Sequence, residues 1–87
     1  MKLTILTQQN CPACIQLKFL LNGRFKDRVA PLDIQYIVRE ADTFKFEKAA
    51  AKYNARSLPC IIFEETAYNF LPTPKNIEEF LTDTVKI

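Results

Sequence analysis

Histidine is absent from this 87-residue chain, glycine occurs once and cysteine three times. Without histidine, the chain lacks the imidazole ligands of common zinc sites, and proton transfer must rely on water, a carboxyl group or a thiol. One glycine beside five prolines leaves no room for a flexible linker. Three cysteines cannot form a closed disulfide framework. These absences favour one small domain over residues 1–87, with a core that is adequate without cross-links.

Long apolar runs are absent too. No apolar run approaches the ~18 residues that a membrane span needs, and Met1-Lys2 leads straight into a short alternating segment rather than a signal peptide. The sequence therefore predicts a cytoplasmic protein without membrane contact. Because cytoplasmic disulfides are rare, a close cysteine pair in such a protein more often serves catalysis or metal binding than cross-linking.

Charge is nearly balanced, with a net charge of +2. Basic residues prevail in residues 1–30 and acidic residues in residues 61–87. Such an asymmetry could orient a protein partner, although ordinary solvated surfaces are the commoner explanation. We expect no nucleic-acid partner.

The apolar residues change between strand spacing and helix spacing along the chain. Short β-branched and apolar runs predict four strands, at Lys2–Thr7, Asp33–Val38, Cys60–Phe63 and Thr66–Leu71. Apolar spacing and capping residues predict three helices, from Pro12 to a cap at Gly23, from Asp42 or Thr43 to Asn54, and from Pro74 to Val85. Residues 24–32 are predicted to be a basic connector. The order β-α-β-α-β-β-α predicts an α/β fold with a four-stranded mixed sheet and three helices on its two faces.

Some details of these elements are also predicted. The first helix is expected to be largely buried, because only Gln16 and Lys18 interrupt its apolar residues. The last hairpin turns at Glu64-Glu65, and neither residue favours the positive φ angle that a tight turn needs. Cys60 is expected to face the core as a small apolar residue, with a third reactive thiol as the alternative.

The segment Cys11-Pro12-Ala13-Cys14 stands where the first strand gives way to the first helix. Residues three apart share a helix face, so the two sulfurs can meet. Cys11 lies beside the free N–H groups and the positive dipole end of the helix, and both favour the thiolate over the thiol. Because the thiolate attacks in disulfide exchange, Cys11 is the predicted nucleophile. Cys14, predicted to be more buried, would resolve the mixed disulfide.

Three chemistries share this cysteine spacing. A structural disulfide across one helical turn closes almost no loop and adds little stability. A zinc site needs four ligands, and the chain offers only Cys60 besides the pair. Thiol–disulfide exchange is therefore favoured. An iron–sulfur or metal-binding site, completed across a dimer by glutathione or Cys60, and an interaction module with idle thiols remain alternatives.

A strand, the Cys-Pro-Ala-Cys motif, a helix and then Ser57-Leu58-Pro59 before a short apolar strand resemble the glutaredoxin branch of the thioredoxin superfamily. The resemblance covers nearly the whole chain and implies a thioredoxin/glutaredoxin fold. It also implies that Pro59 is cis and lies against the active-site disulfide. The backbone of Leu58 would then pair with an extended substrate such as glutathione.

Two subclasses of that branch differ in their motifs. Glutathione-dependent glutaredoxins usually carry an aromatic residue between the cysteines and a Gly-Gly pair after the last strand. This chain has Pro12-Ala13 and, after the last strand, residues 69–73 without glycine. Residues 55–59 and Phe70-Leu71-Pro72 are more similar to the glutaredoxin-like hydrogen donors of ribonucleotide reductase, which are typically reduced by thioredoxin reductase. Asn69 stands where those donors usually have glycine.

The expected protein is thus a small thiol–disulfide oxidoreductase that reduces protein disulfides, with ribonucleotide reductase as a candidate acceptor. Its reductant would be thioredoxin reductase or glutathione, with no bound cofactor or metal, and a monomer is expected. Arg56, a candidate contact for a substrate carboxylate, is equally well explained as a solvated loop residue. Cys11 and Cys14 are the expected catalytic residues, and the expected substrate-binding residues are Pro12, Ala13, Arg56, Leu58 and Pro59.

Overall fold

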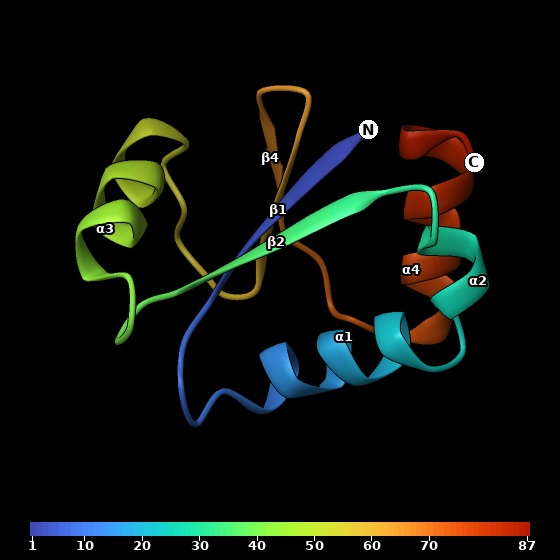
Figure 1. The fold of residues 1–87 in the computed structure, drawn as a ribbon, viewed down its shortest axis with the longest axis horizontal. Coiled ribbons are helices and arrows are strands. Elements are labelled where there is room, and N and C mark those ends of the chain that lie inside the picture. The colour runs from blue at the N-terminus through green and yellow to red at the C-terminus, as the bar shows by residue number, and fades with distance from the viewer.

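Four strands form one mixed sheet in the computed structural model, which describes residues 1–87 (Figure 1). The strands are β1 (Lys2–Thr7), β2 (Asp33–Val38), β3 (Cys60–Phe63) and β4 (Thr66–Tyr68), and their order in the sheet is β2-β1-β3-β4. β1 pairs in parallel with β2 and antiparallel with β3, which pairs antiparallel with β4. The predicted mixed sheet is therefore confirmed, and the architecture is compatible with a thioredoxin-like fold.

The helices differ from the prediction in number. They are α1 (Pro12–Asn22), α2 (Lys26–Val29), α3 (Thr43–Lys52) and α4 (Pro74–Glu79), and a π-helical segment, Phe80–Val85, continues α4. The prediction of three helices is wrong, because residues 24–32 contain α2 rather than a plain connector. Phe25, Val29 and Leu32 are buried there at helical spacing, so the basic residues between them conceal an amphipathic turn.

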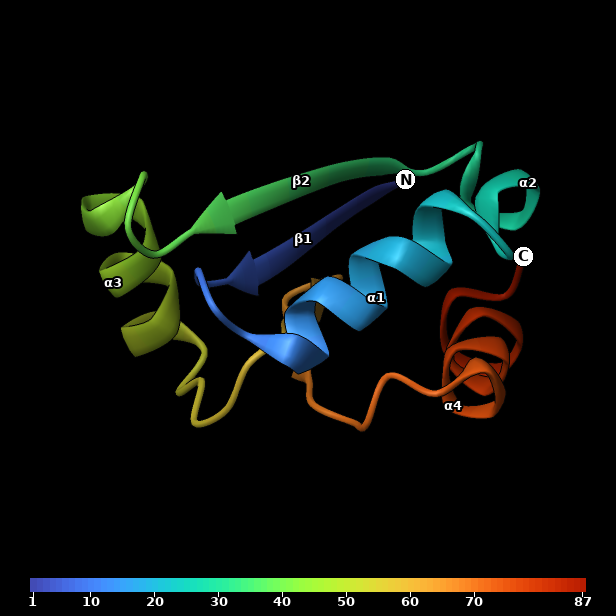
Figure 2. The same cartoon turned by 90° about the horizontal axis from the view of Figure 1, so that it is seen from below.

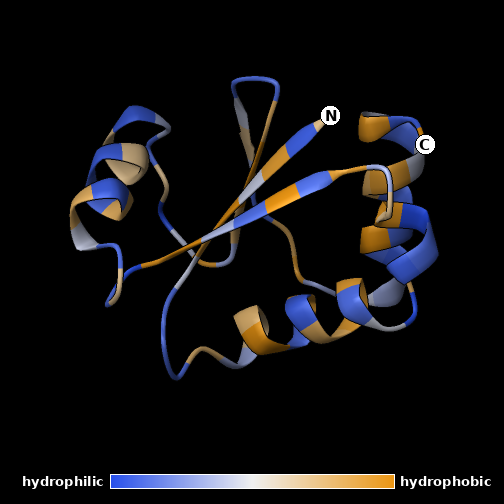
Figure 3. Cartoon of the chain, viewed as in Figure 1, coloured by the Kyte–Doolittle hydropathy of each residue, from blue (hydrophilic) through white to orange (hydrophobic).

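The sheet separates two apolar clusters. Residues of alternate strand positions, such as Leu3 and Ile5, pack with α1, α2 and α4 on one face. The positions between them, such as Leu6 and Ile62, pack with Phe46 of α3 on the other face. Figure 3 shows apolar residues in both β1 and β2, and Figure 2 shows α3 apart from the other helices. The two faces follow from the period of two in strands.

Several predicted helix ends are confirmed. Pro12 is the first residue of α1, and the backbone N–H of Gly23 bonds to a carbonyl of the last turn. Asn54 follows α3 with a φ angle of 52°, as expected for a residue that tolerates the left-handed conformation. The Thr73 hydroxyl accepts a hydrogen bond from the N–H of Asn76 at 3.2 Å and so caps α4.

The prediction that α1 is largely buried is wrong. Only Cys14, Leu17 and Leu21 are buried, at the spacing of one helix face. Ile15 is 64% exposed and Phe19 is 63% exposed, because the sheet covers α1 from one side only. The outer face of α1 therefore carries apolar side chains that nothing in the chain covers.

β4 is shorter than predicted, and its hairpin turn is unusual. The strand ends at Tyr68, after which the ring of Phe70 packs on Phe80, with 5.4 Å between ring centroids. Glu64 and Glu65 have φ angles of 50° and 64°, the left-handed conformation that a two-residue hairpin loop requires. The pairing of β3 with β4 thus outweighs the preference of Glu64 and Glu65 for negative φ angles.

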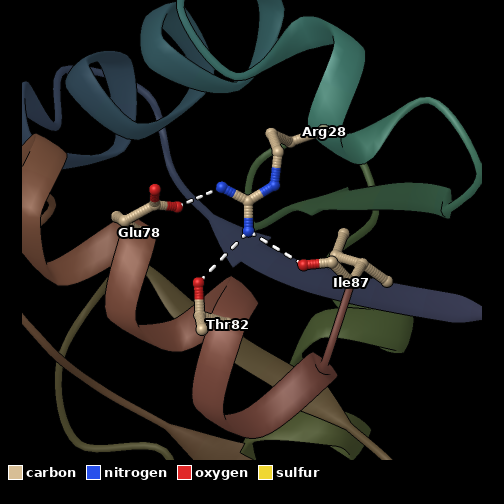
Figure 4. A network of polar contacts seen from close by, with 4 residues as sticks. All are labelled: Arg28, Glu78, Thr82 and Ile87. Atoms are coloured by element: carbon tan, nitrogen blue, oxygen red, sulfur yellow. Dashed lines mark hydrogen bonds and ion pairs between the residues drawn. The ribbon is translucent and has the colours of Figure 1, made fainter.

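Arg28 joins α2 to the C-terminal segment (Figure 4). Its guanidinium donates to the Glu78 carboxylate, to the Thr82 hydroxyl at 3.2 Å and to the Ile87 carbonyl at 2.9 Å. These bonds join α4 and its continuation to α2, which packs in the same apolar cluster. No helix of residues 1–87 combines the length and apolar character needed to cross a membrane.

Candidate redox-active site

A disulfide between Cys11 and Cys14 occupies the junction of β1 and α1, with 5.2 Å between the two Cα atoms. Cys11 is the N-cap of α1 and has an extended backbone conformation. Its Sγ accepts a hydrogen bond from the backbone N–H of Cys14 at 3.2 Å. Pro12 starts the helix at once because its fixed φ suits the first position. The local sequence thus places one sulfur directly on the free N–H groups of the first turn.

The two cysteines differ more in position than in burial. Cys11 is 7% exposed and Cys14 is 5% exposed, so the predicted contrast in burial is small. Their positions differ by a full helical turn, and only the N-cap sulfur receives a first-turn N–H. Because such donors and the helix dipole stabilise a negative charge, Cys11 is the better thiolate and Cys14 the better thiol.

The Leu58–Pro59 bond lies at the same edge of the sheet as the disulfide. The carboxyl end of β1 lies beside the amino end of β3, since Leu6 is the register partner of Cys60. Cys11 follows the end of β1, and Pro59 immediately precedes β3. The bond is cis, as the resemblance implied, with Pro59 buried and Leu58 half-buried.

A hollow of about 310 Å³ beside this edge is lined by two arginines. Arg56 and Leu58, both predicted to bind substrate, line it together with Arg39, which sequence reasoning missed. The Arg39 guanidinium donates to Oε1 of Gln8 at 3.4 Å and lies 5.7 Å from the Phe46 ring centroid. Arg39 directly follows a strand parallel to β1, and that position could have identified it, because parallel strands end at one edge. Glu47 lines the same hollow, so the charged side chains leave one net positive charge there, which suits a single carboxylate.

Asn69 is a second residue that sequence reasoning missed. Its Nδ2 donates to the carbonyl of Ser57 at 2.8 Å and to the carbonyl of Pro59 at 3.2 Å. These two carbonyls flank Leu58, so one amide group holds the backbone on both sides of that residue. In the sequence, Asn69 stood out only as a departure from glycine. Its hydrogen-bond acceptors lie ten and twelve residues away, so no pattern around Asn69 indicates them.

Asn69→Ala is expected to raise the KM for a protein disulfide by up to about thirtyfold with little change in kcat, since two hydrogen bonds are lost and each is worth about 1 kcal/mol. The measurement is the rate at which the prereduced variant reduces insulin, as a function of insulin concentration. Asn69→Leu, which is close to asparagine in size but has no donor, should behave in the same way. An unchanged KM in both variants would show that Asn69 does not position the loop.

Cys60 lies apart from the pair in its packing. It is 0% exposed and belongs to the cluster on the α3 face, with Leu6 and Ile37. Burial raises the pKa of its thiol, and a hydrogen bond with Asn69 partly opposes this. The prediction of a core cysteine is confirmed. Residues 1–87 contain no cluster of three or more histidine, cysteine, aspartate or glutamate side chains that could hold a metal ion.

No protein-family model, curated protein or solved structure matches this chain. The chain is a small α/β protein with a mixed four-stranded sheet, and it has a disulfide-forming Cys-x-x-Cys pair at the start of α1. That combination is compatible with redox function.

Proposed function

We propose that this protein is a glutaredoxin-like thiol–disulfide oxidoreductase that uses the dithiol of Cys11 and Cys14 to reduce protein disulfides. The observation that carries the proposal is the position of the disulfide, with the Cys11 sulfur at the N-cap of α1. The position of Pro59 at the end of the sheet where Cys11 lies and the resemblance of the motifs support it.

The exchange follows from the two positions. The Cys11 thiolate attacks one sulfur of the substrate disulfide, which forms a mixed disulfide and releases one substrate thiolate. Cys14 then loses its proton to water or the released thiolate and attacks Sγ of Cys11. This step closes the Cys11–Cys14 disulfide and releases the second substrate thiolate. Two electrons pass from the dithiol to the substrate, and a separate reductant must return two.

Exposed apolar side chains beside the disulfide support a protein as the acceptor. Ile15 and Phe19 follow Cys11 at intervals of four residues, so they continue along α1 from the reactive end. Large apolar side chains grouped on a surface are typical of protein contacts. Ribonucleotide reductase as the particular acceptor rests on the resemblance alone.

Phe19→Gln is expected to raise the KM for insulin about fivefold and to leave the reduction of bis(2-hydroxyethyl) disulfide unchanged, because burying an aromatic side chain contributes about 1 kcal/mol or more to a protein contact. Single-turnover reduction by the prereduced variant measures both. Phe44→Gln is the comparison variant, since Phe44 is 79% exposed on a different helix, α3. Equal losses with both acceptors, or in both variants, would contradict a docking role for Phe19.

A glutathione-coupled glutaredoxin is the second candidate function. The hollow between Arg39 and Arg56 favours it, because two guanidinium groups could bind a glutathione carboxylate. The absence of a Gly-Gly pair after the last strand favours thioredoxin reductase instead. The two reductants define two separate predictions about the same dithiol.

Two coupled assays test the proposal and separate these reductants. One follows NADPH oxidation with thioredoxin reductase, the other with glutathione and glutathione reductase, each with a disulfide acceptor. Turnover with thioredoxin reductase alone would support the hydrogen-donor subclass. Turnover with glutathione would support binding between Arg39 and Arg56. No turnover in either assay, with Cys11 shown to be reduced and accessible, would overturn the oxidoreductase proposal.

A further inference from the structure

A groove lies on the face of the sheet that α3 covers only in part. Its floor includes one row across three strands, because Thr4 is the register partner of both Gln35 and Ile62. Ile37, two residues further along β2, also contributes, and Ala49 belongs to the α3 wall. The groove has a volume of about 340 Å³. On the floor, Gln35 is exposed and Thr4 half-buried, whereas Ile37 and Ile62 are buried against α3.

Four lysines surround this groove: Lys2, Lys45, Lys48 and Lys52. The last three recur every three or four residues along α3 and so share one helix face. No aspartate or glutamate lines the groove. Lys52 is paired with Glu65 at 3.4 Å, and Lys2 has Asp33 as its register partner in β2. Lys45 and Lys48 form no ion pair and leave the groove with an unbalanced positive charge.

We infer that this lysine groove binds an extended acidic segment of a partner protein. Carboxylates of such a segment would meet Lys45 and Lys48, while its apolar side chains would contact Ala49 and Tyr53, which are half-buried in the lining. A positively charged, partly apolar lining suits a chain in which acidic and apolar residues alternate, because successive side chains of an extended segment point to opposite sides.

The lining fits a nucleic acid or a free phosphate less well. It contains no arginine, the residue that binds phosphate in a bidentate manner. Its one aromatic residue, Tyr53, donates its hydroxyl to Glu65 at 3.1 Å, whereas single-stranded nucleic acids are held by several stacking rings. An acidic polypeptide is therefore the ligand that the groove favours.

The groove extends along the α3 face of the sheet from Lys2, at the start of β1, to Ile37, the register partner of Leu6. Lys2 begins β1, and Cys11 follows its end, after a strand of six residues that is about 20 Å long. The groove is on the α3 face, whereas α1 packs on the opposite face. A partner bound in the groove would leave Cys11 uncovered. Any disulfide that the partner carries would then have a raised local concentration near Cys11. Binding itself is independent of the proposed redox function.

The test is fluorescence anisotropy with the 87-residue protein and a labelled peptide of six Glu-Val repeats. The variant Lys45→Glu/Lys48→Glu should bind this peptide at least about tenfold more weakly, since two attractions become repulsions. Both changes suit α3, because one adds a negative charge near its N-terminus and the other places glutamate four residues before Lys52. Lys26→Glu/Lys75→Glu, with the same net charge but outside the groove, should bind within about twofold of the parent.

Amide shifts from peptide titration in NMR spectra should include those of Thr4, Gln35 and Ala49. Equal weakening in both double variants would overturn the inference, because it would show a general charge effect. Failure of the parent protein to bind the peptide at low salt would overturn it too. Tighter binding of a twelve-residue oligothymidine or of tripolyphosphate than of the peptide would likewise reject an acidic polypeptide as the ligand. Each result can be read whether or not the dithiol proves catalytic.

Discussion

Cys11→Ser is expected to lower the turnover of disulfide substrates by at least about a thousandfold, because a serine hydroxyl does not ionise near neutral pH and cannot form a mixed disulfide. The loss should appear with protein and small-molecule acceptors alike. Either coupled assay described above measures it. A variant that kept a tenth or more of the parent turnover would show that another thiol attacks.

Cys14→Ser is the matched variant and should separate attack from resolution. It keeps the attacking sulfur at the N-cap of α1 but cannot close the ring. Mass spectrometry should therefore find a stable mixed disulfide on Cys11 after exposure to substrate. Cys60 should stay unmodified in the folded protein, because it is buried and burial raises the pKa of its thiol. Modification of Cys60 before Cys11 would contradict the assigned roles.

Leu17→Ala is expected to lower the free energy of unfolding by about 2–5 kcal/mol, the usual cost of emptying a buried leucine site. Leu17 is 1% exposed and shares the buried stripe of α1 with Cys14 and Leu21. Since small domains are stable by only about 5–15 kcal/mol, a loss of this size should shift the midpoint of urea unfolding strongly. The same experiment tests whether α1 is anchored on the sheet through this face.

Ile15→Ala on the same helix is the control for Leu17→Ala. Ile15 is 64% exposed, so its truncation should change the free energy of unfolding by less than about 0.5 kcal/mol. Comparable losses at both positions would mean that α1 is buried on two sides. That result would support the original expectation that α1 is largely buried. It would also mean that the outer face of α1 is not free to bind a protein.

Local patterns predicted most elements because their causes are local. The bounds of β1, β2 and β3 agree with the prediction, since strand runs are limited by nearby polar and proline residues. Pro12 and Thr73 mark the starts of α1 and α4 because each acts within one helical turn. Of the candidate site, the pairing of Cys11 with Cys14 could be predicted on the same ground.

Other features depended on contacts that are distant in the sequence. The sequence did not predict α2, because it is only four residues long and three of these are charged. Its apolar residue Val29 indicates a helix only once its packing in the core is known. The turn at Glu64-Glu65 adopts positive φ angles, and Lys52 and Tyr53 of the α3 end both bind Glu65. Hydrogen bonds and the charge of Lys52 lower the pKa of Glu65. Such support for a turn cannot be read from the turn itself.

The sequence by itself was enough to favour one class of chemistry. Two thiols three residues apart at the start of a helix, in a chain without histidine, favour disulfide exchange over a zinc site. Only the tertiary structure decided the surroundings. Strand pairing brought Pro59 to the edge where Cys11 lies and placed Asn69 across Leu58. It also left the outer face of α1 and the lysine groove uncovered. Thiol reactivity is set within one helical turn, whereas access and recognition are set by surfaces that distant segments build together.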